Sequence, residues 1–359
     1  MGPSSTYNSV TLIRAIGATA IVHKTVGYLW IALLLSTGSL FAADRPYQYF
    51  RAGSSHDVET KIRPGFALMG GGADLDDAFK YMCERSGGGD FLVLRASGDD
   101  DYNPYIQGLC KLNSVGTLIL TSREAANDPF VADTIRHAEA VFIAGGDQAH
   151  YINWWMDTPV QQALNEAIAR GVPMGGTSAG LAVQGEFIYS AQGDASDDED
   201  LSSPLTLANP FHPRVAIVHN FLTNALLKNV ITDTHFAARD RMGRTLVFMA
   251  RILQDGRARQ IGDIAIDERT AVLLDADGQS TVVGAGNAYF LRSTQPPEIC
   301  RRETPLTFRG IAVRSLHAGE HFDVKQWSSA GGTTYTLSVE SGVIKSTLPG
   351  GSVYLRAPK

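Results

Sequence analysis

Residues 172–180 read Val-Pro-Met-Gly-Gly-Thr-Ser-Ala-Gly, and helix-compatible residues continue from there to Val183. The central G-x-S-x-G, with an apolar run before it and a helix after it, is typical of a sharp turn that lifts a serine hydroxyl above a sheet. We therefore predict Ser178 to be a nucleophile. The amide of Ala179 would donate a hydrogen bond to the oxyanion that forms when the serine attacks a carbonyl group. An ordinary glycine- and serine-rich turn is the alternative.

The same alternation of short apolar runs and helix-length stretches extends along residues 62–260. Apolar runs that end in glycine or hydroxyl residues indicate strands of a parallel sheet, with helices covering both faces. The sequence thus predicts an α/β fold whose ligands bind beyond the carboxyl ends of the strands. The expected strands span 65–69, 91–94, 117–120, 140–144 and 172–174, and the expected helices span 74–85 and 158–170.

The pattern of apolar runs changes after about residue 260, where we expect short strands that follow one another at hairpin spacing. A turn-rich tail continues this pattern, with strands expected at 334–339 and 352–355, and Pro296-Pro297 marks a boundary. We predict four regions, namely a signal peptide at 1–43, a linker at 44–61, a catalytic α/β domain at 62–293 and a β-rich C-terminal extension at 294–359.

The first 43 residues carry an apolar run, 26–35, between a basic flank and small residues. This order is typical of a secretory signal peptide, and the run is too short for a stable membrane span. An uncleaved N-terminal anchor is the alternative. Removal of this segment would take the formal charge from −6 to −8, because it contains Arg14 and Lys24 and no acidic residue. We expect a secreted or periplasmic protein, and the acidic balance argues against nucleic acid as a partner.

The chain has three cysteines, so at most one disulfide can form within it. Cys83 and Cys110 are closest in sequence, although spacing alone does not decide the pairing between these two and Cys300. None of the three lies at metal-binding spacing from a histidine, and His317 with His321 lacks the H-E-x-x-H pattern. We predict neither a metal nor a cofactor.

A serine nucleophile needs a base, and His235 is the best-placed histidine. It follows the apolar run 230–232, which should end at the same edge of the sheet as Ser178. Arg239, Arg241 and Arg244 come next, and at about 100° per residue they cannot share one face of a regular helix. From the residues alone, these arginines are either carboxylate-binding groups or a solvated surface.

Three motifs together resemble cyanophycinase, a family of serine peptidases related to aspartyl dipeptidase E. They are FIAGGDQ at 142–148, GGTSAG at 175–180 and DTHFAARDRMGR at 233–244, and the similarity covers roughly residues 62–293. The resemblance implies a core similar to class I glutamine amidotransferases, and the N-terminal segment and the tail resemble the exported type. Its substrate, cyanophycin, is a polyaspartate backbone that carries arginine on each side-chain carboxyl, from which β-aspartyl-arginine dipeptides are released.

The resemblance also implies roles for individual residues. Ser178 is the nucleophile, His235 the base, and Gly145 or Gly146 the second oxyanion donor. Asp194 is the predicted acid of the triad, because it follows the strand 187–189 most closely among Asp194, Asp197 and Asp198. The substrate pocket is implied to be lined by Gln148, Asp233, Arg239, Arg241 and Arg244. The family has glutamine where this chain has Thr234, which affects the subsites.

The resemblance implies cyanophycin or β-aspartyl peptides as the partner, and a homodimer. Other readings remain open from the sequence. An isoaspartyl or acidic dipeptidase would share the serine turn, as would a lipase or esterase of the α/β-hydrolase fold, although no H-G-G-G segment is present. A non-catalytic binder of arginine-rich polymer would use the acidic run 194–200 and the arginines.

Overall fold

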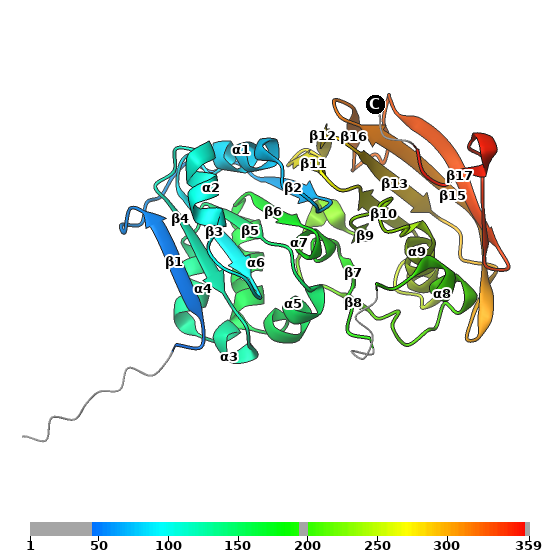
Figure 1. The fold of residues 1–359 in the computed structure, drawn as a ribbon, viewed down its shortest axis with the longest axis horizontal. Coiled ribbons are helices and arrows are strands. Elements are labelled where there is room, and N and C mark those ends of the chain that lie inside the picture. Colours follow the sequence, from blue (N-terminus) through cyan, green and yellow to red (C-terminus); the bar gives the residue numbers. More distant parts are fainter. Residues whose placement is uncertain (1–44, 194–199, 356–359) are drawn as a thin grey trace, which may run out of the picture. The chain divides into compact units, whose positions relative to one another are not determined.

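A computed structural model describes residues 45–193 and 200–355, which belong to one compact unit (Figure 1). The predicted signal peptide lies outside the described residues. Among the residues that are described, no helix is both long enough and apolar enough to cross a membrane.

The first sheet contains the parallel strands that the sequence predicts. Its five central strands run parallel, whereas β1 at one edge and β11, β12 and β16 at the other are antiparallel to their neighbours. In sheet order the strands are β1 (Gln48–Gly53), β4 (Ser114–Ile119), β3 (Asp90–Arg95), β5 (Ala140–Ile143), β6 (Met174–Thr177), β2 (Gly65–Met69), β11 (Thr270–Asp275), β12 (Gln279–Gly284) and β16 (His321–Asp323).

Helices cover both faces of this sheet, because apolar side chains point to both sides of its buried strands. Along β3, Phe91 and Val93 pack towards α1 and α2, whereas Leu92 and Leu94 pack towards the opposite helices. The helices on the first face are α1 (Asp76–Arg85) and α2 (Tyr102–Leu109), and those on the second are α3 (Arg123–Ala126), α4 (Pro129–Arg136), α5 (Gln148–Trp155), α6 (Pro159–Arg170) and α7 (Ala179–Ala182).

A second sheet begins with strands of the predicted catalytic region and continues into the predicted extension. Its order is β18 (Val343–Ser346), β17 (Thr333–Glu340), β15 (Thr304–His317), β13 (Asn287–Ser293), β10 (Ile261–Ile266), β9 (Val230–Asp233), β7 (Phe187–Tyr189) and β8 (Ile217–His219), and β14 (Ile299–Arg301) pairs with β15. Because β15 pairs with β13 along six residues, the C-terminal strands extend this sheet across the predicted boundary at 293/294.

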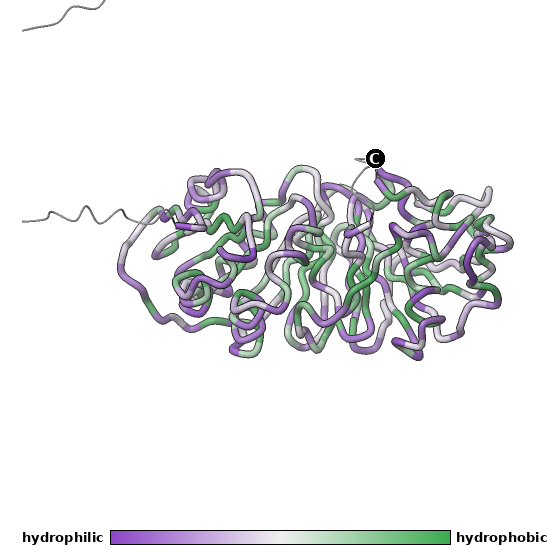
Figure 2. The backbone as a smooth tube through the Cα atoms, turned by 90° about the horizontal axis from the view of Figure 1, so that it is seen from below, coloured by the Kyte–Doolittle hydropathy of each residue, from purple (hydrophilic) through white to green (hydrophobic). Residues whose placement is uncertain are grey.

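The two faces of the second sheet belong to different cores. Ile264 and Ile266 of β10 face the core shared with the first sheet, and Ile261 and Ala265 face a core with α8 (Ser203–Ala208) and α9 (Met242–Gln254). Figure 2 shows hydrophobic stretches of backbone inside the molecule and hydrophilic stretches at the turns. This packing brings the carboxyl ends of β6 and β9, from different sheets, next to each other.

The end of the chain differs from the prediction, because residues 352–355 form no strand. The helical turn Pro349–Gly351 precedes them. The hydroxyl of Tyr354 accepts a hydrogen bond from the amide of Met242 at 2.7 Å and donates one to Asp240 at 3.0 Å. An unpaired amide in the first turn of α9 is satisfied in this way, which fixes this segment through a side chain instead of a strand pairing.

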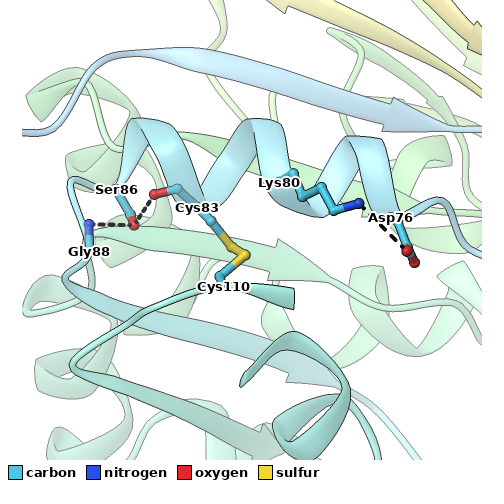
Figure 3. The surroundings of a disulfide bond; sticks show 6 residues. All are labelled: Asp76, Lys80, Cys83, Ser86, Gly88 and Cys110. Atoms are coloured by element: carbon cyan, nitrogen blue, oxygen red, sulfur yellow. Dashed lines mark hydrogen bonds and ion pairs between the residues drawn. A yellow bond between two sulfur atoms is a disulfide. The ribbon is translucent and has the colours of Figure 1, made fainter. Parts of the chain in front are cut away.

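One disulfide joins Cys83 on α1 to Cys110 directly after α2, with their Cα atoms 6.3 Å apart (Figure 3). The bond connects the two helices that cover one face of the first sheet. Cys300 is buried and has no cysteine partner. The pairing that the sequence left open is therefore between the two cysteines nearest in sequence.

Candidate active site

Ser178 lies at a sharp turn between β6 and α7. Its backbone has φ 52° and ψ −118°, a strained conformation for a residue with a side chain. The turn depends on two glycines, since a Cβ on Gly176 would lie 2.4 Å from the carbonyl oxygen of Gly180, and one on Gly180 would lie 1.9 Å from that of Ile143. The glycines of the motif therefore allow the close backbone approach that presents the serine hydroxyl.

His235 meets this serine from the second sheet, just beyond the end of β9. Its Nε2 lies 2.7 Å from Ser178 Oγ, and only 6 % of the residue is exposed. Its own φ is 46°, and its amide donates to the carbonyl oxygen of Gly70 at 2.7 Å. A Cβ on Gly71 would come within 2.4 Å of the imidazole, so that glycine is required for the ring to reach the serine.

The Nδ1 atom of His235 lies 2.7 Å from Oε1 of Glu268, which takes the position of the acid in the triad. The acid predicted from the sequence, Asp194, lies outside the described residues. β10 runs parallel to β9, with Ala265 opposite Asp233, so the residues that follow both strands emerge at the same edge. Glu268 shortly after β10 could have been found from this pattern, because it follows a neighbouring parallel strand as His235 does.

The electrostatic surroundings of Ser178, His235 and Glu268 favour proton transfer from the serine to the histidine. Burial lowers the pKa of His235, and Arg239 and Arg241 lower it further, whereas the hydrogen bond with Glu268 acts in the opposite direction. The hydrogen bond from His235 holds the pKa of Glu268 below its ordinary value. At neutral pH the imidazole is thus neutral and able to accept a proton, and the carboxylate is ionised and able to stabilise the imidazolium that forms.

The predicted oxyanion donors lie beside Ser178. Ala179 is the first residue of α7, and within the described ranges its amide donates no hydrogen bond to another protein group. A Cβ on Gly145 would lie 3.5 Å from that of Ser178, so the Gly145-Gly146 turn after β5 borders the same space. The Ala179 amide and the Gly145-Gly146 turn therefore both lie beside the serine.

The structure places Asp233 and Arg244 differently from the prediction, because they bind each other instead of facing a substrate. Arg244 Nε donates to Asp233 Oδ2 at 2.9 Å, Nη2 donates to Oδ1, and Thr245 donates to Oδ2 at 2.9 Å. Asp233 is 3 % exposed and Arg244 is 2 % exposed. Although burial opposes the shift, Arg244 holds the pKa of Asp233 below its usual range.

Arg241 is also buried and has internal partners. Its Nη1 donates to the carbonyl oxygen of Thr234 at 2.9 Å and to its hydroxyl at 3.1 Å. Its Nε and Nη2 donate to the carboxylate of Asp200 at 3.0 and 2.7 Å, and Arg244 Nη1 donates to the same carboxylate at 3.0 Å. Thr234 therefore fixes the position of Arg241. The carboxylate of Asp200 accepts the hydrogen bonds that Arg241 and Arg244 would otherwise have available for a substrate.

Two of the five predicted substrate residues remain accessible. The side chain of Arg239 is 47 % exposed, and its Nη1 lies 4.0 Å from an oxygen of Asp200, the only carboxylate within that distance among the described residues. Gln148, at the start of α5, is partly exposed and donates a long hydrogen bond of 3.5 Å to the carbonyl oxygen of Tyr189. The three arginines arise from a turn, 236–240, followed by α9, which explains why they fit no single helical face.

No three histidine, cysteine, aspartate or glutamate side chains within the described parts of the chain gather where they could hold a metal ion. His321 lies 3.0 Å from the hydroxyl of Thr281, and His317 lies against Glu320.

The strand-turn-helix around Ser178 and its pairing with His235 define a serine hydrolase-type site on an α/β scaffold. The sequence pattern of peptidase family S51 matches residues 68–279, and the chain belongs to that family.

Curated relatives are cyanophycinases. That of Trichormus variabilis is 28 % identical over 218 residues, which cover 59 % of this chain and 66 % of the relative. That of Geminocystis herdmanii is 26 % identical over 214 residues, or 58 % of this chain and 71 % of the relative. The match thus spans just under two thirds of the first relative's length. A crystal structure of a peptidase from an acI-B1 Actinobacterium matches 74 % of this chain and 98 % of its own, with 16 % identity and a TM-score of 0.48.

Proposed function

We propose that this protein is a serine peptidase that hydrolyses cyanophycin and releases β-aspartyl-arginine dipeptides. The observation that carries the proposal is the line of hydrogen bonds from Ser178 Oγ through His235 to Glu268, with both contacts at 2.7 Å. Membership of peptidase family S51 and the cyanophycinase relatives support the choice of bond and substrate.

The first half of the reaction forms an acyl-enzyme. His235 Nε2 takes the hydroxyl proton while Ser178 Oγ bonds to a backbone aspartyl carbonyl carbon, and Glu268 stabilises the resulting imidazolium. The Ala179 amide and the Gly145-Gly146 turn stabilise the negative oxygen. The carbon–nitrogen bond then breaks, and the proton on His235 passes to the leaving amine.

The second half repeats these roles with water. His235 takes a proton from a water molecule, whose oxygen attacks the ester carbonyl, and the ester bond to Ser178 Oγ breaks. The proton returns from His235 to the serine oxygen, so the free enzyme is regenerated with one water consumed. In each half His235 acts first as the base and then as the acid, which is why a single triad serves both halves.

Substrate binding would rest mainly on Arg239 and Gln148. Each repeat of cyanophycin presents the free carboxylate of an arginine, and the guanidinium of Arg239 is suited to such a group. Arg241 and Arg244 are committed to Asp200 and Asp233, so we assign them to positioning the turn that carries His235 and Arg239.

We further propose that the protein is exported to the periplasm or the medium. The N-terminal pattern at 1–43 and the disulfide between Cys83 and Cys110 support this proposal, since disulfides persist in oxidising compartments. Amino-terminal sequencing of protein recovered outside expressing cells tests it. A start near residue 44 is expected, and retention of the whole chain inside the cells would contradict export.

Mass spectrometry of the products formed from cyanophycin tests the proposed activity. The unaltered protein should release β-aspartyl-arginine, Ser178→Ala should release none above background, and Ser328→Ala, a change of an exposed serine, should behave as the parent. Full activity of Ser178→Ala would refute the nucleophile. Hydrolysis of short β-aspartyl peptides without release from the polymer would refute the substrate and favour a dipeptidase.

A further inference from the structure

A cavity of about 390 Å³ lies at the outer edge of the first sheet, between β1 and α4. Asp90 and Ser114, the first residues of β3 and β4, line it, so it lies at the amino ends of these parallel strands. Ser178 follows the carboxyl end of β6, which is four strands away from β1 (Figure 1). Asp90 is on β3, two strands from β6, so at about 4.8 Å per strand the two places are roughly 10 Å apart across the sheet, and they lie at opposite ends of the parallel strands.

Asp90 is a buried carboxylate in which one oxygen accepts three hydrogen bonds and the other accepts none among the described residues. Its Oδ1 accepts hydrogen bonds from Arg51 Nη2 at 3.0 Å, Asn113 Nδ2 at 2.8 Å and the hydroxyl of Ser114. Its Oδ2 is buried and has no hydrogen-bond partner among the described residues, although the residue is only 6 % exposed. A buried carboxylate oxygen without a partner is costly unless a ligand supplies a donor.

Further acidic groups lie near Asp90. Asp57 and Asp133 line the same cavity. Among the described residues, its basic groups are Arg51, which binds Asp90 Oδ1, and His137, whose Nδ1 lies 3.7 Å from Asp133. Asp57 is exposed but its partial desolvation raises its pKa, and the neighbouring Asp90 raises it further, whereas His137 and Arg51 lower it. Glu139 accepts a hydrogen bond from the Asp90 amide at 2.7 Å. The carboxyls of Asp57 and Asp90 lie close together, and a cation between them would stabilise both in the ionised form.

One wall of the cavity is aromatic. Tyr49 and Phe130 both line it, and their rings meet edge to face with centroids 5.3 Å apart. A planar cation can lie against such a wall while its edge donates to carboxylates. A guanidinium combines both properties, because its donors form a flat fork that matches a carboxylate, whereas an ammonium group is a compact, strongly hydrated charge.

We propose that this cavity is a second binding site, separate from the catalytic serine, for the guanidinium group of an arginine. Asp90 Oδ2 and Asp57 would accept its hydrogen bonds, and Tyr49 and Phe130 would contact its face. The choice of arginine over other organic cations rests on the proposed function, because every repeat of cyanophycin carries this group and every released dipeptide retains it. The site would hold either the polymer away from the catalytic centre or free arginine compounds.

Calorimetric titration of the full chain with L-arginine and with Nα-acetyl-L-arginine tests this site. Ser178→Ala serves as the parent, so that nothing is turned over. We expect Asp57→Asn to weaken binding about tenfold, as loss of a charged hydrogen-bond partner typically does. Asp57 is exposed, so this variant should fold normally, whereas Asp90→Asn removes a group that holds three others. Asp277→Asn, the same change on the exposed β11–β12 turn, should bind as the parent does.

The two arginine compounds distinguish the source of the ligand. Binding of both, with polymer retention that also depends on Asp57, indicates the polymer, whereas binding of L-arginine alone indicates the free amino acid. Equal affinity of parent and Asp57→Asn would overturn the proposal, as would binding that Arg239→Ala abolishes, since that places the ligand at the active site. Because binding is measured without turnover, failure to cleave cyanophycin would refute the proposed function and leave this result unaffected.

Discussion

Replacement of Glu268 by glutamine tests the assignment of the acid in the triad. Glutamine has nearly the same shape, and its carbonyl oxygen can still accept a hydrogen bond from His235 Nδ1. The substitution therefore removes the negative charge while leaving an acceptor for the ring. We expect slower hydrolysis, because the imidazolium that forms as Ser178 attacks loses its counter-charge.

The expected loss of rate in Glu268→Gln can be worked out from the contact between His235 and Glu268. Two unit charges about 4 Å apart interact by about 4 kcal/mol at an effective dielectric constant of roughly 20. The Glu268 side chain is 38 % exposed, so solvent screens part of this interaction. Halving the figure gives about 2 kcal/mol, which corresponds to a fall of about 30-fold in kcat/KM.

The pH dependence of kcat/KM provides a second readout that a purely structural role would not move. Glu268 raises the pKa of His235, so its loss lowers that pKa further. The histidine is active when neutral, and the acidic limb of the profile should therefore move to lower pH in Glu268→Gln. Initial rates of dipeptide release between acidic and neutral pH measure both the limb and the plateau.

Two variants complete the comparison. Glu84→Gln makes the same change at an exposed glutamate of α1 and should leave both rate and profile unchanged. Asp194→Asn removes the acid favoured by the sequence alone and should also retain activity. An unchanged plateau and limb in Glu268→Gln, or a loss of activity confined to Asp194→Asn, would refute the assignment of Glu268.

Three other changes have defined outcomes. Gly71→Ala should reduce kcat strongly with little change in KM, because its Cβ would lie 2.4 Å from the His235 ring at a φ of +95°; normal kcat would contradict this positioning role. Asp263→Asn should stabilise the protein increasingly as pH rises above about 4, because burial and Asp233 raise the pKa of Asp263 and its ionisation opposes folding. Urea unfolding at several pH values should show this gain in the free energy of unfolding growing with pH, and a gain that is independent of pH would argue against this reasoning. Replacing Cys83 and Cys110 together by serine should cost about 3.5 kcal/mol, since their separation is 27 residues, and an unchanged urea midpoint would disprove it.

The fold was largely predictable because its strands are continuous apolar runs that end at turn residues. The expected strand 65–69 coincides with β2, and 140–144 overlaps β5. β6 was less well placed, since three of its four residues are Gly175, Gly176 and Thr177, which the sequence pattern assigned to the turn. Gly176 permits close packing of the strand against Gly180 of α7, an interaction that the pattern of a single apolar run does not reveal.

The candidate site was predictable where one local motif determines the geometry, and was missed where it depends on which strands pair. The serine turn is local, and His235 follows a recognisable strand. Glu268 depends on the pairing of β10 with β9, which no motif specifies. The sequence could not show that Asp233 and Arg244 bind each other inside the protein. A side chain at the end of a strand can face either solvent or a neighbouring helix, and the sequence pattern does not decide between the two.

The arginines after His235 show why charge alone does not identify a substrate pocket. Three positive groups beside His235 would strongly lower the pKa of the imidazole. Asp233 and Asp200 each bind two of these groups, so most of their charge is compensated within the protein. Arg239, which has only a 4.0 Å contact with Asp200, keeps an exposed guanidinium close to the base. A substrate carboxylate that binds Arg239 would offset its effect on His235 and raise the pKa of the base when substrate is present. Recognition of the substrate and proton transfer would then be coupled through one side chain.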